Sequence, residues 1–231
     1  MYQPKLSDAP EADFAPRIVL DRDGLVTYDG YFLEPRIADH AFHVLLGDTP
    51  WCQEFLKMYG RRIPFPRLTA WYGDHGAAYT YSNIKNEPLP WTPVLKDIRD
   101  RLLRRMGVRF DSVLLNLYRH GEDSLSWHAD DEAELGNEPT IASISLGAVR
   151  EFQLKHRLDG ETRSLPLESG SLLIMSGPTQ RSWVHRVPKE RNVRQTRINL
   201  TFRVIDASLH AGQSLLARPT KRSVGTPRPR R

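Results

Sequence analysis

Residues 197–203 read Arg-Ile-Asn-Leu-Thr-Phe-Arg, a run in which polar and apolar side chains alternate strictly. In a β-strand, successive side chains point to opposite faces, so one face of this strand is apolar and the other polar. Arg197, Asn199 and Arg203, with Thr201, share the polar face, which we expect to line the interior of a barrel. A buried arginine needs an anionic partner, because an unpaired interior charge is too costly. A bound acidic molecule would provide that partner, and so would an internal Asp or Glu.

The chain around this strand is a series of short strands. After Gly107, alternating apolar and polar runs separated by turn residues occupy residues 112–118, 140–146, 151–155, 171–175, 182–187 and 196–204. Two earlier runs, residues 17–20 and 25–32, flank an Asp23-Gly24 turn. So many short strands indicate a double-sheet barrel. We therefore predict a mostly β fold with flanking helices and a double-stranded β-helix (jelly roll) core.

Two amphipathic helices are predicted in the N-terminal half. The first follows Pro35, has apolar residues at helical spacing and is expected to end at Gly47. In the second, Thr92 is suited to cap the N-terminus, Pro93 to occupy the first position, and Gly107 to end the apolar stripe. We expect these helices to cover one outer face of the barrel.

Length and charge distribution indicate one globular domain followed by a basic tail. The 231 residues are enough for one large domain, and 39% hydrophobic with 26% charged residues is typical of a globular protein. Residues 218–231 hold six basic and no acidic residues, so the remainder has 27 basic against 28 acidic residues, a charge of −1. A nucleic-acid footprint on the body must then be a local patch. We expect disorder at residues 1–16, one domain at 17–206, and a basic disordered tail at 207–231 that is either a solubilising end or an electrostatic tether.

Cysteine content and hydropathy indicate the compartment. Cys52 is the one cysteine, which excludes a disulfide framework and favours a reducing environment. No signal peptide is evident, and no apolar run is long enough to cross a membrane. We expect a monomer without membrane association, cytoplasmic in a bacterium or nuclear in a eukaryote.

A second motif supplies metal ligands. His128, Ala129 and Asp130 place an imidazole and a carboxylate two residues apart, on the same face of an extended segment with Ala129 turned away. His185 lies in a separate run with apolar neighbours, and a barrel can bring the two runs together. Two histidines and one carboxylate form the facial triad of non-haem iron sites, which leaves coordination positions open. For an isolated His-x-Asp, a structural hydrogen-bonded pair is the alternative; zinc is another, but no thiolate cluster accompanies the site.

These motifs resemble the AlkB family of iron(II)- and 2-oxoglutarate-dependent dioxygenases, and are closest to its nucleic-acid repair branch. The resemblance covers roughly residues 28–206. The segments that carry it are Asn116-Leu117-Tyr118, residues 128–132, His185 and residues 197–203, together with residues 66–74, 79–82, 142–148 and 170–175. The His-x-Asp…His pattern is shared by many oxygenases, whereas the Arg-x-Asn-x-Thr-x-Arg strand is far more specific.

The resemblance implies a set of cofactor contacts. By similarity, His128, Asp130 and His185 bind Fe(II), with O₂ and 2-oxoglutarate as co-substrates. Arg197 would pair with the distal carboxylate of 2-oxoglutarate, and Arg203 and Asn116 would contact the end that chelates iron. Tyr118 and Asn199 would complete the pocket.

The resemblance also implies a nucleic-acid substrate, DNA or RNA. The family oxidises N-alkyl groups on damaged bases of the 1-methyladenine and 3-methylcytosine type, which reverses the damage directly. Such chemistry requires the base to leave the stack. Tyr81 is the expected aromatic wall of the base pocket, Tyr79 a backbone contact, and Glu132 a hydrogen-bonding partner of the base; as isolated residues, the tyrosines would be ordinary strand aromatics and Glu132 a solvated acid.

Residues 54–67 are expected to form a hairpin beside this pocket. Family members that act on duplex DNA carry an apolar finger here, so Tyr59 is the expected wedge, with Arg61 and Arg62 on phosphates. An exposed loop with solubilising charges is the alternative. The loop at residues 155–163 is shorter than in duplex-specific relatives, so the preference for single or double strands stays open.

Two other functions compete with DNA demethylation. One is demethylation or hydroxylation of RNA or protein by the same fold, which Glu132 and the two tyrosines disfavour for protein but not for RNA. The other is non-catalytic nucleic-acid binding by a degenerate metal site. Every expected ligand position is filled, which argues against the second alternative.

Overall fold

The computed structural model describes residues 16–58, 61–75, 79–81, 84–86 and 88–205. Apart from Pro16, the two terminal segments that we expect to be disordered lie outside these ranges. The longest helices of the described chain have 14 residues, and none of its helices is long and apolar enough to cross a bilayer.

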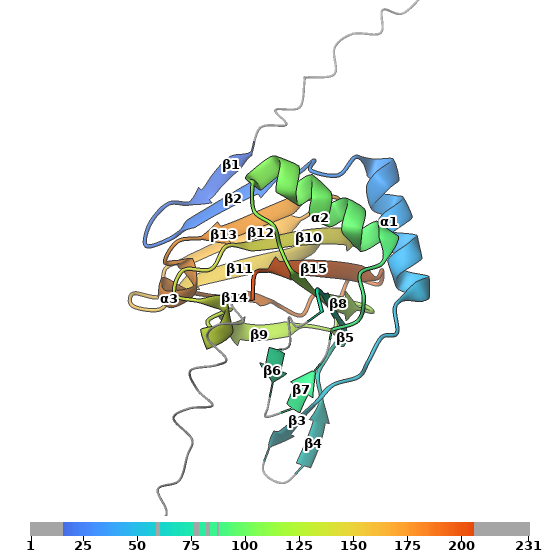
Figure 1. The fold of residues 1–231 in the computed structure, drawn as a ribbon. Coiled ribbons are helices and arrows are strands. Elements are labelled where there is room, and N and C mark those ends of the chain that lie inside the picture. The colour runs from blue at the N-terminus through green and yellow to red at the C-terminus, as the bar shows by residue number, and fades with distance from the viewer. Residues whose placement is uncertain (1–15, 59–60, 76–78, 82–83, 87, 206–231) are drawn as a thin grey trace, which may run out of the picture.

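Two antiparallel sheets face each other and form the jelly roll expected from the sequence (Figure 1). The larger sheet has seven strands in the order β1-β2-β13-β10-β15-β8-β5. Their bounds are β1 (Arg17–Leu20), β2 (Leu25–Asp29), β5 (Leu68–Gly73), β8 (Ser112–Tyr118), β10 (Ile141–Gly147), β13 (Leu172–Ser176) and β15 (Arg197–Arg203). Strand β15 lies inside this sheet, paired with β10 on one side and β8 on the other.

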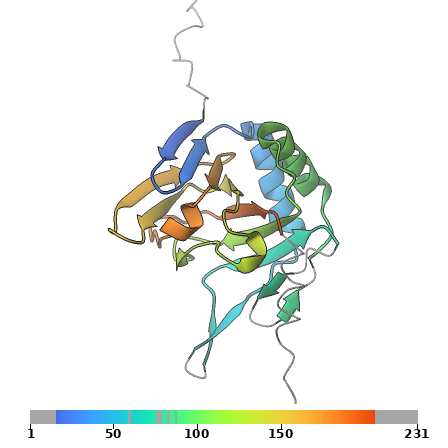
Figure 2. The same cartoon turned by 60° about the vertical axis from the view of Figure 1, so that its left-hand side comes forward.

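The smaller sheet has four strands in the order β12-β11-β14-β9. Their bounds are β9 (Leu125–His128), β11 (Arg150–His156), β12 (Thr162–Leu167) and β14 (Trp183–Val187). Two separate hairpins, β3 (Phe55–Met58) with β4 (Arg61–Pro64) and β6 (Tyr79–Tyr81) with β7 (Ile84–Asn86), lie below edge strand β9 in Figure 1. The first of these hairpins projects from the body of the protein, as Figure 2 shows from the side.

Two helices cover the outer face of the larger sheet, as the sequence predicts. Helix α1 (Pro35–Asp48) and helix α2 (Pro93–Met106) pack over it in Figure 1. The Thr92 side chain accepts a hydrogen bond from the Leu95 backbone amide at 3.3 Å, and Gly107 ends α2 with φ of 69°, a left-handed conformation that glycine adopts without strain. The expectation that Gly47 ends α1 is wrong, because the helix continues to Asp48. Two short elements complete the fold, the 3₁₀ turn η1 (Ala133–Leu135) and α3 (Thr179–Ser182).

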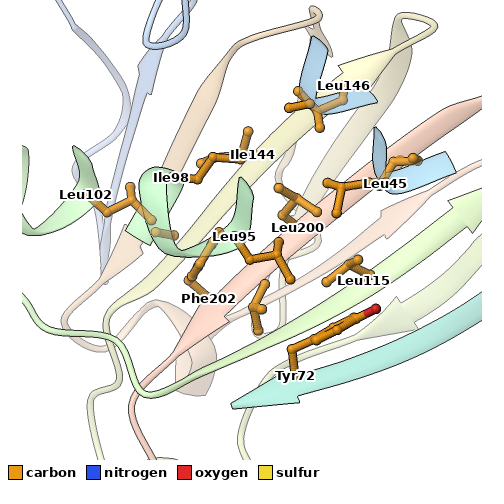
Figure 3. Packing of buried hydrophobic residues seen from close by; sticks show 14 of the residues in the cluster. Leu45, Tyr72, Leu95, Ile98, Leu102, Leu115, Ile144, Leu146, Leu200 and Phe202 are labelled. Carbon is orange, nitrogen blue, oxygen red and sulfur yellow. The ribbon is translucent and has the colours of Figure 1, made fainter. Parts of the chain in front are cut away.

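The alternation in residues 197–203 separates two kinds of environment. Ile198, Leu200 and Phe202 are fully buried in the core between the larger sheet and the helices. Figure 3 shows this packing, with Leu200 and Phe202 among leucines and isoleucines of α1, α2, β8 and β10. A second apolar cluster, which includes Trp183 and Phe152, fills part of the space between the two sheets. The polar members of β15 point into the rest of that space.

Candidate functional site

A cavity of about 550 Å³ opens between the two sheets. The larger sheet contributes polar side chains from β8, β10 and β15, and the smaller sheet contributes the ends of β9 and β14. All eight residues expected to bind metal or co-substrate line it, namely Asn116, Tyr118, His128, Asp130, His185, Arg197, Asn199 and Arg203. The fold therefore brings together residues that are up to 87 positions apart in the chain (116 to 203).

The three candidate metal ligands converge at one end of this cavity. His128 ends β9, Asp130 follows two residues later, and His185 is the register partner of His128 on β14. The potential ligand atoms of the three side chains all lie within 4.8 Å of one another. Because β9 ends at His128, the segment does not continue as a strand, and Ala129 lines the cavity instead of turning away from it as predicted.

Hydrogen bonds fix the orientation of two of these ligands. The Nδ1 atom of His128 lies 2.9 Å from the Ser126 carbonyl oxygen. A carbonyl can only accept, so Nδ1 carries the proton and Nε2 keeps its lone pair for a metal. The backbone amide of Asp130 donates to the Gln180 side-chain oxygen at 3.0 Å, and Gln180 is itself buried.

The protonation states of the cluster suit metal binding. Burial, with a smaller contribution from the neighbouring charge of His128, lowers the pKa of His185 to about 3, so this imidazole is neutral near pH 7. Burial acts most strongly to raise the pKa of Asp130, but the charges of Arg203 and the two histidines outweigh it, and the pKa is lowered. His185 therefore presents a neutral imidazole and Asp130 a carboxylate, the forms in which these groups coordinate metals.

Arg203 is paired inside the protein. Its Nη2 atom donates to Asp130 Oδ1 at 2.5 Å, and both side chains are largely buried. The internal pairing left open by the sequence is thus realised for this arginine. Arg203 holds one oxygen of the candidate ligand carboxylate while it lines the same cavity.

Arg197 has no such carboxylate. Its side chain is 1% exposed, and its Nη2 atom donates to Ser145 Oγ at 2.9 Å. The Nε and Nη1 atoms have no hydrogen-bond partner among the described residues, and the guanidinium lies over the Tyr118 ring at 5.2 Å. Burial lowers the pKa of Arg197, with Tyr118 opposing that effect. A buried guanidinium with two unused donors facing a cavity fits a bound carboxylate, to which arginine donates in a bidentate fashion.

The two asparagines are held by neighbouring strands. Asn116 Oδ1 accepts from Arg67 Nε at 2.7 Å. Asn199 Nδ2 donates to Ser143 Oγ at 2.7 Å, and Asn199 Oδ1 accepts from Thr201 Oγ1 at 2.9 Å. These contacts fix the polar wall of the cavity without using an ion pair.

Only some of the residues expected to contact the substrate lie within the part of the chain that the structure describes. Glu132 lines the cavity, beyond Asp130. Tyr79 and Tyr81 belong to β6, but the described atoms do not include their side chains, and Tyr59 lies outside the described residues. Arg61 and Arg62 are exposed on β4, outside the cavity, and Arg62 lies over the Phe55 ring at 4.4 Å.

Three residues that support the site, of which Arg67 lines the cavity itself, were not predicted from the sequence. Ser145 and Arg67 contact the polar wall, and Gln180 orients Asp130. Ser145 could have been found, because residues 142–146 alternate apolar and polar like residues 197–203. Arg67 and Gln180 carry no such signal, since their roles depend on which loop lies beside the cavity.

Comparisons with known proteins agree with this geometry. The model of the 2OG-Fe(II) oxygenase superfamily matches residues 24–203. The chain is 41% identical to human "alpha-ketoglutarate-dependent dioxygenase alkB homolog 3" over 220 residues, which cover 85% of this chain and 74% of the relative. It is 42% identical to human "DNA oxidative demethylase ALKBH2" over 159 residues, 65% of this chain and 60% of the relative. The solved structure of OsALKBH1 covers 81% of this chain and is itself fully covered, with a TM-score of 0.55 at 20% identity, which shows a shared fold.

We expect metal-induced stabilisation to depend on the three converging side chains. Fe(II) added without oxygen at about 100 times its Kd should stabilise the wild type by about 2.7 kcal/mol, because a ligand that binds only the folded state shifts the unfolding equilibrium. His185→Ala should lose most of this shift in a thermal or denaturant melt. The control is His43→Ala, which removes an exposed histidine of α1. Equal stabilisation of His185→Ala and the wild type would exclude His185 from the site.

Proposed function

Because the chain belongs to the 2OG-Fe(II) oxygenase superfamily and is an AlkB homologue, it is an iron(II)- and 2-oxoglutarate-dependent dioxygenase, and we propose that it removes N-alkyl groups from damaged bases in DNA. The expected lesions are of the 1-methyladenine and 3-methylcytosine type, and the reaction repairs them by direct reversal. The similarity to a human DNA oxidative demethylase, 42% identical over 159 residues, supports this choice.

One observation carries the assignment of the site. A buried arginine with unused donors, Arg197, lies in the same cavity as a cluster of two histidines and an aspartate. A molecule with a carboxylate at one end and metal-chelating oxygens at the other satisfies both features, and 2-oxoglutarate has this structure. We assign Fe(II) to His128, Asp130 and His185, and the distal carboxylate to Arg197.

In this proposal the residues of the chain position the co-substrate and keep water out of the site. When bound, Fe(II) with O₂ and 2-oxoglutarate supplies the oxidising chemistry. Arg197 orients the co-substrate from the closed end of the cavity, while Asn116 and Arg203 contact its chelating end. Arg203 also keeps Asp130 ionised and in place through the 2.5 Å contact. Tyr118 forms an aromatic wall under the Arg197 guanidinium and limits the access of water.

Base recognition is assigned to residues farther out. Glu132 is proposed to hydrogen-bond the damaged base, since it lines the cavity next to the candidate metal ligands. Tyr81 and Tyr79 are proposed to contact the base and the backbone. Tyr59 is proposed as the wedge that replaces the extruded base, and Arg61 and Arg62 as phosphate contacts, because both arginines are exposed on β4.

We expect Arg197→Ala to raise the KM for 2-oxoglutarate sharply. Losing a charge-assisted contact at a desolvated site costs about 2–5 kcal/mol. Arg197→Lys should have an intermediate effect, because lysine keeps the charge but not the planar fork. Arg191→Ala is the matched control, since its side chain is 83% exposed. An unchanged KM in a folded Arg197→Ala variant would assign this arginine a purely structural role.

The proposed activity is tested with a panel of oligonucleotides. Single- and double-stranded DNA carrying 1-methyladenine, 3-methylcytosine or etheno adducts, and matching RNA, are incubated with Fe(II), ascorbate and 2-oxoglutarate. We expect loss of the methyl group from at least one DNA substrate, with formaldehyde and succinate formed together, and no reaction in His128→Ala, Asp130→Ala or His185→Ala. Repair of RNA but not DNA, or of neither, would overturn the proposal.

A further inference from the structure

An aromatic side chain at the mouth of the cavity holds two cations. The Trp127 ring on β9 lies 4.4 Å from the Arg186 guanidinium carbon and 5.0 Å from Lys155 Nζ. Arg186 comes from β14 and Lys155 from β11, so three adjacent strands of the smaller sheet contribute. We call Trp127, Lys155 and Arg186 the rim cluster.

The rim cluster lies next to the candidate metal ligands but on the other side of the sheet. Trp127 precedes His128, and Arg186 follows His185. Side chains alternate across a strand, so the histidines point into the cavity while their neighbours point outward. Trp127, on edge strand β9, and Arg186, on the adjacent strand β14, are nevertheless among the residues that line the cavity. A chain that inserts one base into the cavity must pass over this edge or over the facing hairpin.

Neither cation of the rim cluster contacts an acidic side chain of the described residues directly; the nearest acid along the hydrogen bonds is Glu151, which accepts from Gln153 Nε2 at 2.7 Å. Arg186 Nε donates to the neutral Gln153 side chain at 2.6 Å. Within the described ranges, neither Arg186 nor Lys155 forms an ion pair. Many arginines elsewhere on the surface do, including Arg22 with Asp159, Arg101 with Asp97, Arg109 with Asp74, Arg157 with Asp131, Arg163 with Glu161 and Arg181 with Glu138. The charge that remains unpaired at the rim is thus a local feature of a body that carries a net charge of −1 without residues 218–231.

This arrangement fits a phosphodiester chain. The ring limits the motion of two long side chains, and Gln153 fixes one of them further, so both cations lose less conformational freedom when they bind an anion. Two cations held by one ring and facing solvent suit adjacent phosphates of a polymer. The nearly neutral body offers little non-specific attraction, so affinity has to come from such patches.

We propose that the rim cluster binds the phosphate backbone of the nucleic-acid strand whose target base enters the cavity. The inference rests on the proposed function and extends it by placing the path of the strand over β9 and β14. In Figure 1, β14 and the β3–β4 hairpin lie on opposite sides of β9, so the proposed path passes between elements that carry Arg186 and those that carry Arg61 and Arg62. The contact is to phosphates, so it is independent of base identity.

The test compares two double variants of equal charge. Lys155→Gln with Arg186→Gln removes the rim cations, and Lys96→Gln with Arg104→Gln removes an exposed lysine and an exposed arginine of α2, on the far face of the larger sheet. Binding of a labelled single-stranded DNA oligonucleotide is measured by fluorescence anisotropy over a range of salt concentrations, without oxygen. Both a methylated and an unmodified oligonucleotide are used.

The rim variant should show a salt dependence of log K that is shallower by ~1.4, from two phosphate contacts at about 0.7 each for single strands. At 0.1 M salt this corresponds to roughly 25-fold weaker binding. Both oligonucleotides should lose affinity equally, and the α2 variant should keep the wild-type slope. An unchanged slope in the rim variant, or the same change in both double variants, would overturn the inference.

Two further measurements keep the result interpretable. Lys155→Gln alone, which leaves Arg186 in place, should lower the slope by ~0.7 even if the double variant fails to fold. Demethylation by the wild type is assayed in parallel. If the wild type repairs no DNA but the salt dependence of log K falls in the rim variant as expected, the proposed function fails and the backbone contact stands. If the wild type repairs DNA and the salt dependence of the rim variant is unchanged, only the assignment of the rim cluster fails.

Discussion

The burial of the Arg197 guanidinium without a carboxylate partner is the constraint around which the interior is organised. Removing a cation from water is favourable only when an anion and good hydrogen bonds replace the solvent. The described residues supply one acceptor, Ser145 Oγ, and the face of the Tyr118 ring, and leave two donor atoms of Arg197 unused. If Arg197 binds the co-substrate as we propose, stability and co-substrate binding are linked at this residue, since the dianion would complete an interaction that the described residues leave unfinished.

Strand β15 connects this constraint to the fold. Its apolar residues anchor the larger sheet to α1 and α2, and its polar residues face the cavity. A register shift of one residue would exchange the two sets, so the packing of Leu200 and Phe202 also positions Arg197 and Arg203. At the other end of the cavity, Arg203 joins the larger sheet to Asp130 and so places the candidate metal ligands of the smaller sheet against it. The core and the site thus depend on the same register.

The parts of the structure that were predictable depend on patterns within one segment. The alternation in residues 197–203 and the cap at Thr92 and Gly107 are local, and both elements formed as expected. The His-x-Asp pair is also local, and its two side chains converge with His185, although the extended segment ends at His128. The roles of Gln180 and of the Trp127–Arg186 contact depend on the pairing of distant strands and loops, which no single segment specifies. The end of β9 at His128 could not be predicted either, because it depends on how the chain leaves the edge of the sheet. The side chains expected to hold the base stay predictions, because Tyr59 lies outside the described residues and so do the side-chain atoms of Tyr79 and Tyr81.

The central claim is that Arg197 recognises the distal carboxylate of a co-substrate held at the metal cluster. The most direct measurement is a calorimetric comparison of 2-oxoglutarate with 2-oxopentanoate, which has the same carbon chain and chelating end but no distal carboxylate, each titrated into the iron-loaded protein without oxygen. We expect 2-oxoglutarate to bind more tightly by about 2–5 kcal/mol, the range for a buried charge-assisted contact. Equal affinities for the two acids would contradict it.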